Sequence, residues 1–157
     1  MTQARILLAL QFAGIGAVML LPWDFEPSLG GWYGKLYNPG AVMTYAGAAL
    51  ATAGLITGGW AAITMGSSFR VHPDPNGSGL VTGGPFAYVR HPIYSALIFI
   101  ALGYALATGY IVKFGATLFL LVVLHFKAEY EEKALGMIYD DYAAYKQKTG
   151  RFIPFIP

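Results

Sequence analysis

Four long apolar segments follow one another along the chain, and the charged residues are gathered between them. The segments cover residues 6–21, 41–65, 93–110 and 114–126. No Asp, Glu, Lys or Arg occurs between Lys35 and Arg70, or between Arg90 and Lys113. A helix needs about 20 apolar residues to cross the hydrocarbon layer of a membrane. The pattern therefore predicts an all-α integral membrane protein with about four transmembrane helices.

The first and last of these segments each need a further argument. The first follows Arg5 and has features of a signal peptide, but no small-x-small cleavage site comes after it and Pro22-Trp23 suits an interfacial stop. We therefore expect it to be retained as a helix. The fourth is short for a span, and its helix can continue beyond the membrane into the polar residues that follow.

The composition agrees with a membrane location and excludes several kinds of chemistry. Hydrophobic residues make up 56% of the 157 residues and charged residues only 11%, whereas about a quarter of an ordinary globular chain is charged. The chain has no cysteine, which excludes disulfides, thiolate nucleophiles and Cys-ligated zinc. A net charge of +2 gives no reason to expect nucleic-acid binding. The length predicts a single domain, 1–157.

The distribution of Lys and Arg predicts the orientation of the helices, because cytoplasmic loops carry an excess of these residues. With a cytoplasmic N-terminus and four spans, the outer side receives only Lys35 and Lys113. We therefore expect both termini to be cytoplasmic, in a bacterial inner membrane. The outer side would carry an interfacial belt of aromatic residues, Trp23, Trp32, Tyr33 and Tyr37.

The second apolar segment contains Gly54 and Gly58 in GxxxG spacing. Small residues at this spacing let two helix backbones approach closely. We favour helix packing over contact with a ligand. The packing can occur within one chain or between two, so the oligomeric state stays open.

Two further stretches lie on the predicted cytoplasmic side. Residues 66–91 are rich in Gly and Pro and are longer than the roughly 12–15 residues beyond which a loop is usually functional or disordered. Residues 127–148 have apolar positions at helical spacing and predict an amphipathic helix. This helix either rests on the membrane surface or packs its tyrosines over the loop to close a pocket. Gly150 ends it, and RFIPFIP is expected to be an extended tail.

The stretch GPFAYVRHPIYS, residues 84–95, places Arg90 and His91 directly before Pro92 at the start of the third apolar segment. Proline fits the first turn of a helix, so both side chains are expected at the helix mouth. Free N–H groups there favour an anion such as a carboxylate. In the alternative, Arg90 extends only to lipid headgroups.

Acidic residues and a second histidine follow in the fourth segment and beyond it. Glu131 and Glu132 either pair with lysines on an exposed face, or one of them turns inward and holds ribose hydroxyls or an amino group. His125, Glu129 and Glu132 share one helical face, but one histidine and two glutamates are a weak metal signal. We expect no metal site.

Three ordered motifs resemble one enzyme family. They are LVTGGPFAYVRHPIYS (80–95), EEKALGMIYDDYAAY (131–145) and RFIPFI (151–156). In this order they are similar to motifs of the isoprenylcysteine carboxyl methyltransferase and phospholipid methyltransferase superfamily, whose members are integral membrane enzymes that use S-adenosylmethionine. The resemblance covers about half of the chain, and it implies that residues 66–157 form the cofactor-binding half.

The resemblance implies roles for individual residues. His91 and Tyr94 would contact S-adenosylmethionine, with Arg90 shaping the turn beside them. Glu131 and Glu132 would complete the cofactor pocket. The segment before this turn would lend backbone groups to the pocket, at Leu80, Val81, Gly84 and Phe86.

This chain departs from the family pattern at two places. Ala96 stands where the family usually has Gly, which bears on how closely the backbone approaches a ligand. Tyr139-Asp140 replaces a frequent Phe-Gly, with one residue fewer before Tyr142. The helix that follows is therefore expected to be set differently.

The chemistry of the implied cofactor suits these residues. Its sulfonium can lie on aromatic faces such as Phe86, Tyr88 and Tyr94, with an attraction of about 0.5–2 kcal/mol. A carboxylate acceptor needs no base and only a cation to orient it, for which Arg151 and Lys148 are the candidates. An amine acceptor would instead have to lose a proton to a glutamate or a histidine.

The sequence thus predicts an S-adenosylmethionine-dependent methyltransferase that acts on a lipophilic acceptor, such as an isoprenylcysteine-like carboxylate or a related lipid, at the cytoplasmic membrane face. One alternative is a sterol-type membrane reductase that uses NADPH, although no Gly-rich dinucleotide fingerprint occurs. The other is a non-catalytic membrane subunit that binds lipid or a partner protein. That alternative does not explain why the RHP and EE motifs occur together.

Overall fold

The computed structural model describes residues 2–20, 34, 36–66 and 79–156. Within these ranges the chain is helical, and the only β-structure is a pair of isolated bridges. The elements are α1 (Thr2–Leu20), α2 (Ala41–Met65), the 3-10 helix η3 (Gly84–Ala87), α3 (Pro92–Thr108), α4 (Ile111–Ile138) and α5 (Tyr142–Lys148). The predicted all-α class is confirmed for the described part of the chain.

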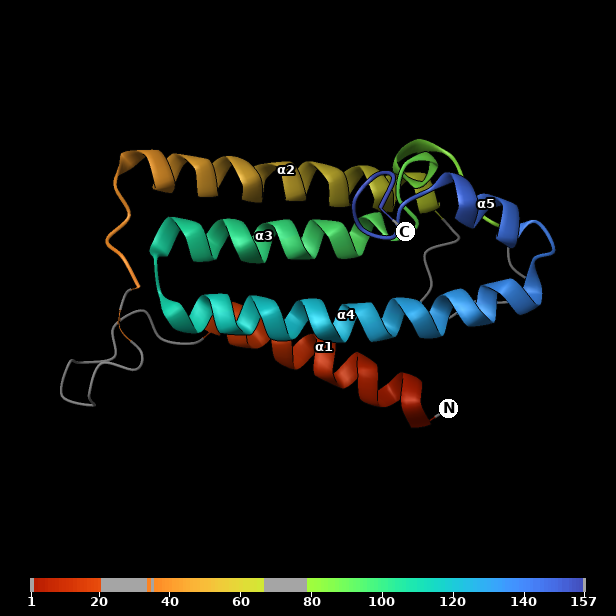
Figure 1. Ribbon diagram of the computed structural model, residues 1–157, viewed down its shortest axis with the longest axis horizontal. Helices are drawn as coiled ribbons and strands as arrows, with labels where there is room; N and C mark the ends of the chain where they lie inside the picture. Colours follow the sequence, from red (N-terminus) through yellow and green to blue (C-terminus); the bar gives the residue numbers. More distant parts are fainter. Residues whose placement is uncertain (1, 21–33, 35, 67–78, 157) are drawn as a thin grey trace.

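Figure 1 shows α2, α3 and α4 side by side, with neighbouring helices antiparallel, and α1 packed against α4. The two ends of the chain, together with η3 and α5, lie at the same end of the bundle. Helices α2 and α4 are long and apolar enough to cross a membrane, whereas the apolar helices at Gln3–Met19 and Pro92–Thr108 are shorter. All four predicted apolar segments are helices, and the number that spans a membrane stays a prediction.

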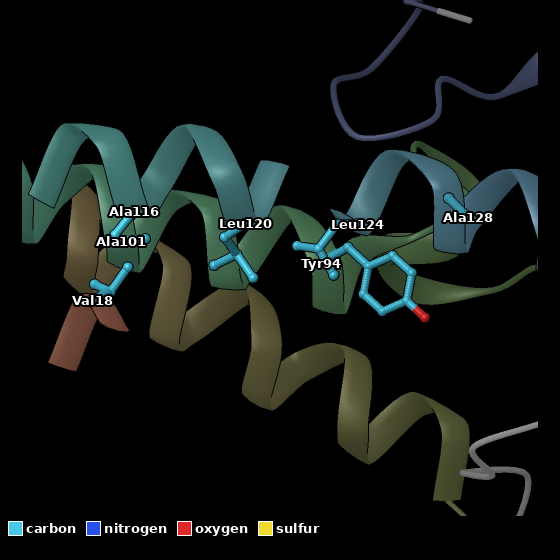
Figure 2. Close-up of a cluster of buried hydrophobic side chains, with 7 residues drawn as sticks. All are labelled: Val18, Tyr94, Ala101, Ala116, Leu120, Leu124 and Ala128. Atoms are coloured by element: carbon cyan, nitrogen blue, oxygen red, sulfur yellow. The ribbon is translucent and has the colours of Figure 1, made fainter. Parts of the chain in front are cut away.

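Side chains from α1, α3 and α4 form a buried core. Leu120 and Leu124, one turn apart on α4, are fully buried in it. In Figure 2 the Tyr94 ring lies beside Leu124, on the side toward Ala128. The core therefore fixes the start of α3, where predicted site residues lie. The members of the cluster are Val18, Tyr94, Ala101, Ala116, Leu120, Leu124 and Ala128.

Glycines of α2 let this helix pack closely on α3. A Cβ atom at Gly47 would lie 2.4 Å from the carbonyl oxygen of Gly103, and one at Gly54 would lie 2.8 Å from that of Ala96. Both distances are too short for a carbon atom, so the close approach requires glycine. The helix-packing interpretation of the GxxxG motif is confirmed, within one chain. Ala96, which replaces a glycine of the family pattern, faces this helix contact.

Gly47→Ala is expected to lower the free energy of unfolding by about 1–3 kcal/mol, because α2 and α3 must shift to admit the methyl group. Gly59→Ala on the same helix is the matched control, since nothing lies within 4 Å of the added carbon. There alanine should raise the free energy of unfolding by about 0.4–1 kcal/mol. Melting temperatures in detergent check both variants, and equal values would contradict the close contact.

The helix of the fourth apolar segment continues into the polar residues that follow, as expected from its short apolar length, but the next predicted element has other bounds. Helix α4 runs without a break to Ile138, so the boundaries predicted for a separate helix over 127–148 are wrong. Residues 127–135 are mostly strong helix formers and include no Gly or Pro. The chain turns at Tyr139, whose backbone is extended (φ −120°, ψ 115°), and α5 starts after the N-cap residue Asp141.

The C-terminal residues 151–156 form a turn, so the predicted extended tail is wrong. The N–H of Arg151 donates to the carbonyl of Ile156 (2.8 Å), and the N–H of Ile156 donates to that of Ile153 (3.2 Å). Pro154 is followed by Phe155, whose φ is 65°. Proline before a residue of positive φ reverses the chain in a type II turn.

Some predictions lie outside the described residues. These are the greater part of the Gly- and Pro-rich connection, residues 67–78, and most of the aromatic belt, Trp23, Trp32 and Tyr33. Of the belt, Tyr37 is described, and its hydroxyl donates to the carbonyl of Leu106 (2.6 Å).

Candidate active site

The residues predicted to form the site lie where the start of α3, the polar end of α4 and the C-terminal residues meet (Figure 1). Pro92 occupies the first turn of α3 and His91 is its N-cap residue, as the position of the proline predicts. Backbone hydrogen bonds join this turn to the C-terminal segment, from Arg90 to Gly150 (2.8 Å) and from His91 to Arg151 (3.2 Å). The segment after α5 is therefore held against the mouth of α3.

Glu132 is the centre of a buried cluster of charges, with a side chain only 3% exposed. Its oxygens accept hydrogen bonds from Arg90 Nε (3.0 Å) and from Arg151 Nε and Nη2 (3.0 and 3.2 Å). Lys146 Nζ lies 3.0 Å from Oε2, and His91 Nε2 lies 3.4 Å from Oε1. Several cations therefore surround one carboxylate and offset the cost of burying its charge.

Arg90 joins the cluster to α5. Its side chain is 1% exposed, and its Nη1 donates to the carbonyls of Lys146 (3.1 Å) and Thr149. Carbonyls at the end of a helix carry the negative end of the helix dipole, so a guanidinium is favourable there. Arg90 therefore points into the protein, and the alternative in which it extends to lipid headgroups is wrong.

His91, Tyr94 and Glu131 form a second group beside the charge cluster. The rings of His91 and Tyr94 are stacked, with centroids 5.2 Å apart and an interplanar angle of 3°. The Tyr94 hydroxyl donates to Glu131, with 2.7 and 2.8 Å to the two carboxylate oxygens. His91 Nδ1 lies 3.7 Å from Glu131 Oε2. Both glutamates of the EE motif therefore face the interior of the site.

A cavity of about 430 Å³ opens between the polar end of α4, α5 and the C-terminal segment. This volume lies in the range of roughly 300–1,000 Å³ that is typical of small-molecule sites. Its wall combines both charge signs with two tyrosines. The charged and aromatic lining residues are Glu129, Glu132, Lys133, Tyr139, Asp140, Tyr142, Lys146 and Arg151.

One tyrosine of α5, Tyr145, packs over the segment around η3, and a second, Tyr142, lies near Gly136 of α4. The Tyr145 hydroxyl donates to the carbonyl of Phe86 (2.7 Å), and Tyr142 is buried. Burial raises the pKa of Tyr142 and raises that of Tyr145 to about 12. Both hydroxyls are therefore protonated at neutral pH, and that of Tyr145 donates to Phe86. Of the two alternatives for this segment, the arrangement agrees with the one in which tyrosines pack over the loop.

Three buried polar atoms at this site have no hydrogen-bond partner among the described residues. They are Arg90 Nη2, His91 Nε2 and the Tyr142 hydroxyl. Nearly all buried polar groups in native proteins are hydrogen-bonded, so each exception needs an explanation. Tyr142 belongs to the cavity wall, so a polar ligand bound in the cavity would supply a partner for its hydroxyl, whereas Arg90 and His91 lie in the charge cluster and do not line the cavity.

Other predicted residues lie at the edge of the site. Gly84 has φ +56°, and a Cβ atom there would lie 2.6 Å from Thr64 Oγ1, so this glycine faces α2. Phe86 is buried, whereas Leu80 and Val81 are half-buried in the segment before η3. Neither Leu80 nor Val81 lines the cavity.

The structure separates the two candidate cations, Arg151 and Lys148, and places the second histidine beside Arg151. Arg151 lies in the cavity wall, while Lys148 is exposed on α5. His125 lies beside Arg151, with 3.3 Å from its Nδ1 to Nη1, and Glu129 pairs with Lys133 (2.8 Å). Within the described ranges, no group of three His, Cys, Asp or Glu residues is arranged to hold a metal ion.

Sequence reasoning missed Lys146, Tyr142 and Tyr139 as parts of the site. A signal for two of them was available, because Tyr142 and Lys146 are four residues apart and share one helical face. Lys148 is rotated away from that face. The role of Tyr139 depends on the turn between α4 and α5, which the apolar pattern did not reveal.

Comparisons with known proteins agree with the motifs. A family profile described as phospholipid methyltransferase matches residues 30–142, and no curated protein matches significantly. The fold is similar to that of the eukaryotic intramembrane Ras methyltransferase ICMT (isoprenylcysteine carboxyl methyltransferase), with a TM-score of 0.60 and 22% identity. The match covers 99% of this chain and 53% of that one, so this chain spans about half its length. The resemblance predicted from the sequence is confirmed.

Proposed function

This chain belongs to the phospholipid methyltransferase family, and from that premise we propose that it transfers a methyl group from S-adenosylmethionine to a lipophilic acceptor at the cytoplasmic face of a membrane. The observation that carries the proposal is the buried cluster around Glu132 in the wall of a 430 Å³ cavity. This cavity lies at one end of a bundle of apolar helices. A polar cofactor and a lipid acceptor can meet at such a boundary.

The residues of the cavity fit S-adenosylmethionine in charge and shape. Lys146 and Arg151 suit its carboxylate. Glu132 suits its ammonium group or ribose hydroxyls, and the rings of Tyr139 and Tyr142 suit its sulfonium by cation–π attraction. When bound, this cofactor supplies a methyl group that is already activated for displacement.

The protein has to hold and orient the acceptor. In such a displacement, most of the catalysis comes from holding the reacting atoms about 3–3.5 Å apart. For a carboxylate acceptor only a cation is needed. Arg151 fits this role, since its Nη1 extends past Glu132 to His125 near the apolar part of α4. For an amine acceptor, a glutamate of the site or His91 would take the proton.

The placement of the cations supports this orientation in the membrane. In the described ranges, Arg5 lies in the first helical turn, and Arg90 before α3 and the cations of the polar end of α4, of α5 and of the C-terminal turn lie at the same end of the bundle (Figure 1). Lys113 lies at the opposite end. By the positive-inside rule the site end faces the cytoplasm, in a bacterial inner membrane.

The test is methyl transfer from radiolabelled S-adenosylmethionine by the purified protein in lipid nanodiscs. Two acceptors are compared, an S-farnesyl cysteine with a free carboxylate and phosphatidylethanolamine. Alkali releases labelled methanol from the methyl ester of a carboxylate acceptor, whereas the N-methyl group of an amine acceptor stays attached to nitrogen. Label in the organic phase supports the proposal, and its release as volatile methanol in alkali identifies a carboxylate acceptor. If NADPH raises the melting temperature and S-adenosylhomocysteine does not, the proposed methyltransferase is wrong and the sterol-type reductase is supported.

A further inference from the structure

A buried polar contact joins α1 to the polar part of α4. Gln11 on α1 is 9% exposed and Lys127 on α4 is 8% exposed. Lys127 Nζ donates to Gln11 Oε1 at 2.7 Å. Buried amide and ammonium groups are costly in an apolar bundle unless they are paired, and in membrane helices they commonly mark function. The family profile matches from residue 30 onward, so α1 and Gln11 lie outside the matched segment.

Lys127 continues this contact into the site. Its Nζ lies 3.7 Å from Glu131 Oε1 and 5.0 Å from the centroid of the Tyr94 ring. Tyr94 in turn donates to both oxygens of Glu131 and is stacked on His91. A continuous series of polar and ring contacts therefore leads from α1 to the imidazole that lies beside Glu132.

We propose that Gln11 is a positioning residue for the cofactor site, because it holds Lys127 between α1 and the Tyr94 ring and so determines where Glu131 and Tyr94 lie. Without the Gln11 acceptor, the nearest acceptor for the buried ammonium is Glu131. Lys127 would then move toward that carboxylate and compete with the Tyr94 hydroxyl for its oxygens. This inference rests on the proposed function, since it concerns the same cofactor site.

The alternative is that Gln11 only attaches α1 to α4, as polar residues between membrane helices commonly do. The two roles differ in what they affect. A purely structural contact changes the melting temperature and leaves the affinity of the folded protein for its cofactor unchanged. A positioning role changes that affinity as well.

The test compares Gln11→Leu, Gln11→Glu and Val18→Ala in the full chain, by melting temperature and by calorimetric titration with S-adenosylhomocysteine. We expect Gln11→Leu to raise the Kd about tenfold, because a buried charged donor loses its partner. Gln11→Glu keeps an acceptor and should restore the wild-type Kd. Val18→Ala truncates a buried core side chain of the same helix and should lower the melting temperature without changing the Kd by more than about twofold.

Two outcomes would overturn the inference. One is an unchanged Kd in folded Gln11→Leu, and the other is an equal rise in Kd for Val18→Ala. If the wild-type protein binds no S-adenosylhomocysteine, the proposed function fails separately. The link between Gln11 and Lys127 is then tested by a double-mutant cycle, which compares the melting temperatures of Gln11→Leu, Lys127→Met and the double variant. Non-additive effects support the Gln11–Lys127 link, whereas additive effects overturn it.

Discussion

Replacement of Glu132 by glutamine is expected to lower the rate of methyl transfer at least a hundredfold and the free energy of unfolding by about 3–5 kcal/mol. The carboxylate is the shared partner of Arg90, Arg151 and Lys146. Removing one partner of a buried ionic cluster leaves the others uncompensated, which costs about 3–5 kcal/mol. A loss of that size in transition-state binding corresponds to a factor of at least a hundred in rate.

The matched control is Asp141→Asn, at the N-cap of α5. Asp141 is exposed, does not line the cavity and makes no capping hydrogen bond with its side chain, so its replacement should leave both the melting temperature and the rate of methyl transfer unchanged. Initial rates with labelled cofactor and thermal unfolding in detergent check the two variants together. If both variants behave alike, the cluster around Glu132 is not the catalytic centre.

Arg151→Gln is expected to reduce the rate about a hundredfold, whereas Lys148→Gln should stay within about twofold of the wild-type rate. Arg151 lies in the cavity wall and is held by Glu132, while Lys148 is exposed on α5. A misplaced acceptor commonly costs about a hundredfold in rate. Initial rates at saturating cofactor check the pair.

Arg151→Lys adds a second control, because it keeps the charge but loses the two-point contact with Glu132. Its rate should lie between those of the wild-type protein and Arg151→Gln. The opposite ranking, with Lys148→Gln inactive and Arg151→Gln active, would transfer the orienting role to Lys148.

Much of the bundle could be predicted because its signals are local. Long charge-free stretches marked the apolar helices, and Pro92 marked the first turn of α3. The spacing of Gly54 and Gly58 indicated close helix packing, and α3 provides the partner. In each case a property of neighbouring residues determines the structure, so one sequence suffices.

The end of α4 and the course of the C-terminal segment could not be read in the same way. Tyr139 turns the chain in an extended conformation without a Gly or Pro beside it, and only the two aspartates that follow are typical turn residues. The turn at Phe155 needs positive φ, which is uncommon for a residue other than glycine. The C-terminal segment is held by backbone hydrogen bonds from Arg90 and His91, which are far from it in the sequence.

The candidate site was predictable in its motifs and not in its contacts. The RHP and EE motifs identified Arg90, His91, Glu131 and Glu132, but no sequence pattern shows that Arg90 and Glu132 meet across 42 positions. The contact of Gln11 with Lys127 joins residues 116 positions apart. Contacts of this kind arise when helices that are far apart in the sequence pack together, so no local sequence pattern predicts them.

Calorimetric titration of the purified wild-type protein in detergent with S-adenosylhomocysteine tests the central claim most directly. The cavity beside Glu132 predicts saturable, one-to-one binding in the micromolar range. Absence of heat from a protein shown to be folded by its unfolding transition would contradict the assignment of this cavity to the cofactor.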